Sequence, residues 1–149
     1  MTRRGVLALV CLLAVASAAR AGGTVPRSQL RSYEDASTIE LTTTGRSSGQ
    51  PRTVTIWFAV DDQGRLYVQS GKDGHTDWYR NLLKTPAVKM RIGELAMSGV
   101  ATPIDDAAEV ARVHELFRQK YLRARITAWF GGEVGHGKVV ELRELSQLP

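Results

Sequence analysis

Thr42-Thr43-Thr44-Gly45-Arg46-Ser47-Ser48-Gly49-Gln50-Pro51-Arg52 is the stretch that decides the fold of this 149-residue chain. A run rich in β-forming residues enters it and another leaves it, which predicts a hairpin with a glycine-rich turn. Glycine allows positive φ and lets a ligand approach the backbone closely. Successive N–H groups of such a turn can bind an anion, and Arg46 and Arg52 add forked donors that suit phosphate. The turn is therefore either a phosphate site or a solvated hairpin tip.

The residues on both sides of this turn predict a small α+β domain. Alternating residues predict strands at Ile39–Thr43 and Thr53–Val60, and the second presents Val54, Ile56, Phe58 and Val60 on one face and Thr53, Thr55 and Trp57 on the other. Further strands are expected at 65–70, 88–92, 95–102 and 138–142, with a short helix at 77–83 and a long helix from Asp105 as far as Phe130. About six hairpin-linked strands with one short and one long helix indicate a small antiparallel β-barrel.

The first 21 residues are typical of a bacterial secretory signal. Arg3 and Arg4 precede the uncharged, mostly apolar run Gly5–Ala19, and Ala19-Arg20-Ala21 is a cleavage site of the A-x-A type. The paired arginines also resemble a twin-arginine export signal, and an uncleaved membrane anchor is the alternative. We therefore expect a signal peptide at 1–21, a connecting arm at 22–36 and one domain at 37–149. The protein would be exported, with membrane association through this segment if it is not cleaved.

Charge and residue counts exclude several function classes. The formal net charge of +5 includes three arginines of the leader, so the rest of the chain carries only +2, too little to indicate nucleic acid as a partner. One cysteine, Cys11, excludes an intrachain disulfide. The histidines His75, His114 and His136 lack the spacing of metal ligands, and no nucleophile motif is present. We expect neither a metal site nor hydrolase chemistry.

Two other features could contribute to a ligand site. Ser70-Gly71-Lys72-Asp73-Gly74 is a second glycine-rich loop whose lysine could join the arginines of the first turn around one phosphate, or could be an ordinary solvated charge. Trp57 and the aromatic residues at 121, 129 and 130 could form the wall for a flat ring system, although such residues at helical spacing more often belong to the core.

These motifs together resemble the deazaflavin-dependent nitroreductase family, also described as coenzyme F-420 dependent quinone reductases. The matching residues are Leu41 to Arg52, Ser70-Gly71-Lys72, Trp78-Tyr79-x-Asn81-Leu82 and Pro86. The resemblance implies a split β-barrel of the flavin-reductase type that holds a phosphate-bearing deazaflavin in a groove.

The resemblance also implies the residues of the site. The phosphate side of the cofactor would be held by Arg46, Ser48, Gly49, Arg52 and Lys72. The deazaflavin ring would lie along Thr55, Ile56, Trp57, Ser70 and Gly71. Tyr121 would line the substrate pocket, and a proton donated by Tyr121 to the reduced product is a further hypothesis.

The implied reaction transfers a hydride from reduced coenzyme F-420 to a small-molecule substrate, either a quinone, a nitro compound or an activated alkene. Two departures favour an alternative, an exported, non-catalytic split barrel that binds FMN, haem or a lipid. Ser47 stands where the family turn commonly has lysine, and the leader is atypical for a cytoplasmic redox enzyme. Small split barrels often dimerise, so a homodimer is an expectation by analogy.

Overall fold

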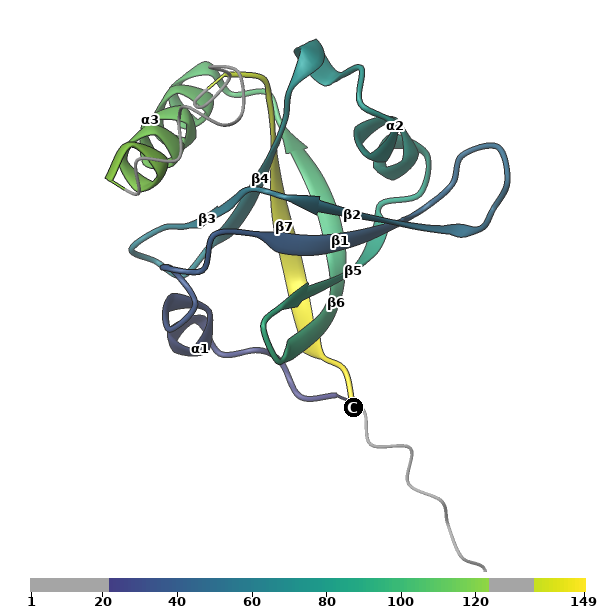
Figure 1. Cartoon of the computed structure of the whole chain (residues 1–149), viewed down its shortest axis with the longest axis horizontal. Coiled ribbons are helices and arrows are strands. Elements are labelled where there is room, and N and C mark those ends of the chain that lie inside the picture. Colours follow the sequence, from purple (N-terminus) through teal and green to yellow (C-terminus); the bar gives the residue numbers. More distant parts are fainter. Residues whose placement is uncertain (1–21, 124–135) are drawn as a thin grey trace, which may run out of the picture.

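A computed structural model describes residues 22–123 and 136–149 of the chain (Figure 1). The expected signal peptide, and the part of the expected long helix that contains Trp129 and Phe130, lie outside these residues. In chain order the elements are α1 (Arg27–Arg31), β1 (Ile39–Thr44), β2 (Pro51–Ile56), β3 (Phe58–Val60), β4 (Leu66–Ser70), the 3-10 helix η1 (Lys72–Gly74), α2 (Asp77–Lys84), β5 (Ala87–Ile92), β6 (Leu95–Ile104), α3 (Ala107–Arg123) and β7 (Lys138–Gln147).

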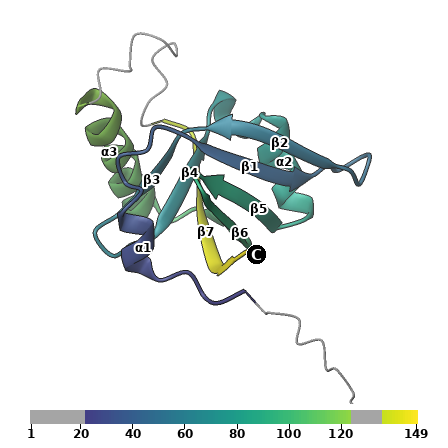
Figure 2. The same cartoon turned by 60° about the horizontal axis from the view of Figure 1, so that its bottom comes forward.

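The strands form one antiparallel sheet with the neighbour order β2-β1-β5-β6-β7-β4-β3. Its two end strands, β2 and β3, follow each other in the chain and are separated by Trp57 alone. The sheet must therefore bend round until its ends meet, as Figure 2 shows, and the result is a split β-barrel. The α+β barrel predicted from the sequence is confirmed.

The sheet has seven strands in the described residues rather than about six, because the predicted strand at 53–60 is interrupted at Trp57. Before the interruption Ile56 pairs with Ile39 of β1, and after it Phe58 pairs with Val68 of β4. The polar arm before the barrel contains the short helix α1, which buries Leu30. The alternation of side chains continues from β2 into β3, although β2 pairs with β1 and β3 pairs with β4.

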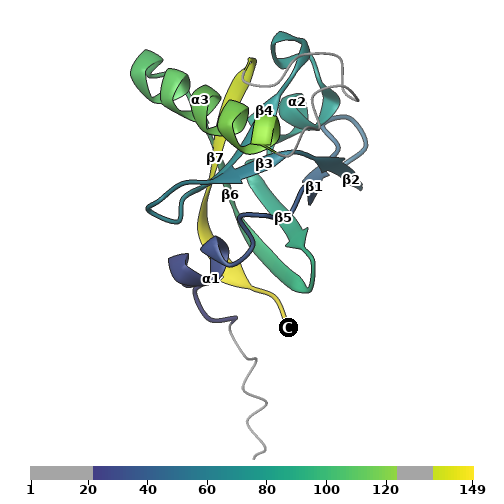
Figure 3. The same cartoon turned by 60° about the vertical axis from the view of Figure 1, so that its left-hand side comes forward.

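Side chains alternate across β2 and β3 and separate two apolar clusters. Phe58 and Val60 point into the barrel, where they join the main core. Trp57 and Ala59 point outward and pack beneath α3 with apolar residues of that helix, among them Phe117. Figure 3 shows α3 lying across the barrel wall. The helix therefore covers an apolar outer face that the alternation itself creates.

Two consecutive residues of α3 bridge the split in the barrel wall. β3 is an end strand, so the N–H and C=O of Phe58 that point away from β4 need partners that no strand supplies. The Tyr121 hydroxyl accepts from the Phe58 N–H at 3.0 Å, and the Lys120 ammonium donates to the Phe58 carbonyl at 2.9 Å. The same two side chains also reach the carbonyls of Ser37 and Ala36, just before β1. Side-chain hydrogen bonds thus replace a missing backbone ladder.

Candidate functional site

The turn between β1 and β2 is closed by its own hydrogen bonds. The N–H of Gly45 donates to the Gln50 carbonyl and that of Gly49 to the Gly45 carbonyl, each at 2.8 Å. The N–H of Gln50 donates to Ser48 Oγ at 3.2 Å, and the N–H of Arg46 is taken by a side chain of α2. Gly49 has φ of +68°, which suits glycine. The hypothesis of an anion cradle built from successive backbone amides is therefore wrong for these four amides.

Arg46 is instead held as a preorganised side chain against α2. Asn81, which is buried, accepts the Arg46 N–H at 3.0 Å and its Nη1 at 3.2 Å, both on Oδ1. The Asn81 Nδ2 donates to Thr43 Oγ1 at 3.1 Å, so the amide is used at both ends. The Arg46 Nη2 forms an ion pair with Asp77 at 2.9 Å, and Lys84 Nζ donates to the Arg46 carbonyl at 2.7 Å. The turn is thereby locked to the helix.

The second glycine-rich loop meets the same helix at its first turn. Ser70 is buried, and its Oγ lies 2.6 Å from the Thr76 Oγ1. Thr76 occupies the N-cap position of α2 but forms no side-chain capping hydrogen bond. The first N–H groups of α2 consequently lack a side-chain cap, and a helix start of this kind favours an anion. The structure thus places both glycine-rich segments against α2: Arg46 contacts Asp77, Asn81 and Lys84 along the helix, and Ser70 contacts Thr76 before its first residue.

Lys72 lies where the second loop is most contorted. Lys72 and Asp73 both have positive φ, 52° and 50°, a conformation that costs energy for residues other than glycine. With Gly71, His136 and Gly137 they line a pocket of about 250 Å³. Lys72 is exposed and follows Ser70 and Gly71 directly in the loop.

The predicted cofactor residues in β2 and directly after it lie on two different faces of the sheet. Arg52 and Thr55 are exposed, whereas Ile56 is half-buried against the barrel core. Trp57 is half-buried and stacks on Tyr121 with the ring centroids 4.6 Å apart and the planes at 20°. Thr55 and Trp57 can therefore face a ligand outside the barrel, and Ile56 could contact it only through its backbone.

Tyr121 is placed as a structural residue. Its side chain is fully buried, and its hydroxyl lies within 3.0 Å of the Phe58 N–H, the Phe58 carbonyl and the Ser37 carbonyl. Burial raises the pKa of the Tyr121 phenol, which makes it a weaker acid. These contacts give no support to the hypothesis that Tyr121 donates a proton to a product, and we assign it no chemical step.

The contacts that organise the site were only partly visible in the sequence. Asn81 belongs to the motif that carries the resemblance, but its bond to Arg46 spans 35 positions of the chain. Thr76 directly precedes the expected short helix, and no sequence pattern indicates that its hydroxyl contacts Ser70. In residues 22–123 and 136–149 no three His, Cys, Asp or Glu side chains are grouped to bind a metal ion. No helix in this part of the chain is long and apolar enough to cross a membrane.

The barrel and its covering helix define a split barrel of the flavin-reductase type, and solved structures share it. An F420-H2 dependent reductase matches with a TM-score of 0.51 and 23% identity, over 71% of this chain and 93% of that one. A conserved hypothetical protein of Mycobacterium tuberculosis matches with a TM-score of 0.56 and 17% identity, over 87% of this chain and 92% of that one. These likenesses concern the fold.

The sequence assigns the family. The family model for F420H(2)-dependent quinone reductase matches residues 14–128, and the chain belongs to this family. F420H(2)-dependent quinone reductases of Mycobacterium tuberculosis and a related protein of Mycobacterium bovis are 35% identical to it over 66 residues. That alignment covers 43% of this chain and 44% of each relative, so the chain matches less than half the length of these relatives.

Proposed function

We propose that this protein binds reduced coenzyme F-420 and catalyses hydride transfer to a small electron acceptor of the quinone type. Family membership and the names of the curated relatives support this proposal. The observation that carries it is the guanidinium of Arg46, which the buried Asn81 of α2 fixes at Nη1 and whose Nη2 reaches Asp77, the first residue of the helix. A preorganised arginine at a helix start suits a phosphate-bearing ligand.

The residues present fit such a cofactor. Arg46, Arg52 and Lys72 provide cations, Ser48 provides a hydroxyl, and the start of α2 provides N–H groups without a side-chain cap. Ser48 Oγ already accepts from Gln50, so its hydroxyl hydrogen remains available to donate to a phosphate oxygen. The deazaflavin, when bound, supplies the hydride. The chain's own residues would bind, orient and shield it.

Trp57 would contribute orientation rather than reactivity. Its ring is stacked on the buried Tyr121, whose hydroxyl is fixed by backbone groups, so the indole is held in one orientation. A rigid aromatic surface next to the exposed Thr55 could lie along one face of a flat ring. Because the indole of Trp57 is already held in one orientation, less conformational entropy has to be lost when the cofactor ring is positioned for the reaction.

The substrate class, export and assembly belong to this proposal as well. Nitro compounds and activated alkenes are further candidate acceptors. We infer export from the leader described above, and its test is detection of the mature protein outside the cytoplasm by cell fractionation. A homodimer is expected only by analogy, and sedimentation equilibrium would test it.

Titration with coenzyme F-420, followed by its fluorescence, tests the proposal. We expect saturable, salt-sensitive binding that is weakened tenfold or more by Arg46→Ala, since a charge-assisted contact is worth about 1.5–3 kcal/mol. Arg91→Ala is the matched control, because Arg91 is paired with Glu40 on the exposed side of β5. Binding of FMN with no binding of coenzyme F-420 would contradict the proposal and favour the non-catalytic alternative.

A further inference from the structure

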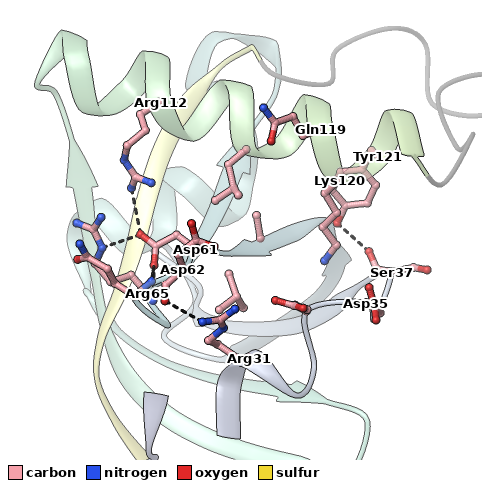
Figure 4. A pocket seen from close by; sticks show the side chains of 15 residues that line it. Arg31, Asp35, Ser37, Asp61, Asp62, Arg65, Arg112, Gln119, Lys120 and Tyr121 are labelled. Atoms are coloured by element: carbon pink, nitrogen blue, oxygen red, sulfur yellow. Dashed lines mark hydrogen bonds and ion pairs between the residues drawn. The ribbon is translucent and has the colours of Figure 1, made fainter. Parts of the chain in front are cut away.

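A pocket of about 670 Å³ is seen from close by in Figure 4, and the elements that line it, α1, β3 and α3, lie in Figure 1 on the side of the barrel opposite the β1–β2 turn. Its wall is formed by α1 and the segment that follows it, by β3 and the β3–β4 turn, and by one face of α3. A volume of this size suits a small molecule. None of the residues predicted to hold the cofactor phosphate lines it.

Part of the charge around this pocket is neutralised within the protein. Asp61 is buried and accepts from Arg65 at 2.7 Å and from Arg112 at 3.2 Å. Glu109 also contacts both arginines, at 3.4 Å and 2.8 Å. These four side chains form a balanced network that fixes the β3–β4 turn to α3. They leave little charge for a ligand.

Two other cations on the pocket wall are not neutralised in this way. Arg31 Nη1 donates to the Asp62 main-chain carbonyl at 3.1 Å. Lys120 Nζ donates to the carbonyls of Ala36 and Phe58 at 2.8 Å and 2.9 Å, and it lies 3.7 Å from the centre of the Phe58 ring. Carbonyl oxygens carry no full charge, and no ion pair of the described residues includes Arg31 or Lys120. Burial lowers the pKa of Lys120 to about 8, and the nearby carboxylates of Asp35 and Glu34 oppose this shift only in part.

Acidic side chains that form no close ion pair line the same pocket, and two of them, Asp35 and Glu34, are near enough to Lys120 to act on its charge. Glu34, Asp35 and Asp62 are exposed, and none of them takes part in an ion pair of the described residues. Figure 4 shows Asp35 and Asp62 around the same cavity as Arg31 and Lys120. Between these groups the wall has an apolar part, to which Leu116 contributes. The pocket thus offers both signs of charge together with an apolar surface.

We propose that this pocket binds a small zwitterion, a molecule with one carboxylate, one ammonium group and an apolar body, as in an aliphatic amino acid. Lys120 and Arg31 would hold the carboxylate, Asp35 with Glu34 would hold the ammonium, and the aliphatic part would lie against Leu116. A ligand with a single charge would pair with either the cations or the carboxylates of the wall and would leave the other set without a partner. Tyr121, predicted from the sequence to line the substrate pocket, is part of this wall, but none of the residues proposed to hold the cofactor phosphate lines it, so the proposal does not depend on cofactor binding.

Isothermal titration calorimetry of the full-length protein with L-leucine tests this proposal. Isocaproate and isoamylamine are matched probes, because each keeps the aliphatic body and only one of the two charges. We expect saturable binding of leucine and at least about tenfold weaker binding of both analogues, since one charge-assisted contact is lost in each. No saturable binding of leucine, or equal affinity for isocaproate, would overturn the proposal.

Variants assign the two ends of the ligand. Arg31→Gln and Asp35→Asn change exposed side chains, so the fold should be retained, and each should weaken leucine binding about tenfold. Lys120→Met keeps the aliphatic stem and should abolish binding, whereas Lys89→Met, an exposed lysine of β5, should bind as the wild type does. Unchanged affinity in Arg31→Gln and Asp35→Asn would contradict the assigned residues even if Lys120→Met failed to fold.

Discussion

The Oδ1 atom of Asn81 accepts two hydrogen bonds from Arg46, one from its main-chain N–H at 3.0 Å and one from its Nη1 at 3.2 Å. One buried amide thus fixes both the backbone of the β1–β2 turn and the direction of the guanidinium. The opposite end of the same amide donates to Thr43 on β1. Asn81 therefore acts as a positioning residue for the proposed phosphate site.

Asn81→Ala should affect stability and ligand binding together. The substitution removes three hydrogen bonds in a buried place, and we expect a loss of about 2–4 kcal/mol in the free energy of unfolding. Urea denaturation measures this loss, and titration with coenzyme F-420 should show weaker binding as well. Gln50→Ala, which changes an exposed side chain of the same turn, is the control. A stable variant with wild-type affinity would mean that Arg46 does not need this anchor.

Asp77→Asn should strengthen binding of the cofactor phosphate. The Asp77 carboxylate occupies Arg46 Nη2 at 2.9 Å, but its side chain is 80% exposed, so the pair contributes at most about 1 kcal/mol. An incoming phosphate must displace this carboxylate and is repelled by it. We expect affinity for coenzyme F-420 to rise by up to about fivefold in a fluorescence titration. A fall in affinity would instead show that Asp77 orients Arg46 for its ligand.

Tyr121→Phe should destabilise the protein without removing a catalytic group. Loss of the hydroxyl leaves the Phe58 N–H without its partner, which we expect to cost about 1–3 kcal/mol in urea denaturation. Tyr33→Phe is the matched control, because Tyr33 is half-buried and its hydroxyl makes no hydrogen bond to another described residue. For quinone reduction we expect kcat within about threefold of wild type. A hundredfold loss of kcat at unchanged stability would restore Tyr121 as a proton donor.

Glu109 should make the protein more resistant to acid. The hydrogen bond from Arg112 is the main cause that lowers the pKa of Glu109 from 4.5 to about 2. Its stabilising contribution is therefore complete above about pH 4.5 and is lost as the pH falls towards about 2. Glu109→Gln should lower stability at pH 7 and flatten the decrease between these values in pH-dependent thermal melts. Glu94→Gln, on an exposed turn, should reproduce the wild-type profile.

Much of the barrel follows from local patterns. Burial on one face imposes a period of two on β1 and β5, whereas β3 and β4 are buried on both faces and their hairpin is predicted by the turn residues Asp61 to Gly64. The interruption at Trp57 is not predictable from alternation, since the pattern continues through it and only the pairing partner changes. β7 extends to Gln147 although Arg143 and Glu144 break the apolar pattern, because one extra residue in β7, where Glu144 has φ of 53°, forms a bulge opposite Gly99 and pairing continues on both sides of it.

The candidate site likewise has parts that local sequence patterns predict and parts that only the tertiary structure determines. Glycine-rich turns with cations are visible in the sequence, because turn chemistry is local. The amide that holds Arg46 lies 35 residues away, and the carbonyl of Ala36 that Lys120 contacts lies 84 residues away. Such contacts are fixed by the tertiary arrangement and leave no spacing signal. The sequence therefore does not predict the pocket of about 670 Å³ beside α3.

The bridge that Lys120 and Tyr121 make between Phe58 and the residues before β1 has a mechanical consequence. Closure of the wall at this point depends on the position of one helical turn and not on strand pairing. If α3 moved by one helical turn, Phe58 and the residues before β1 would lose these hydrogen bonds together, while the hydrogen bonds between strands would remain. The helix that makes these hydrogen bonds also carries Tyr121, on which Trp57 stacks, so the position of α3 controls both the closure of the wall and the orientation of the indole.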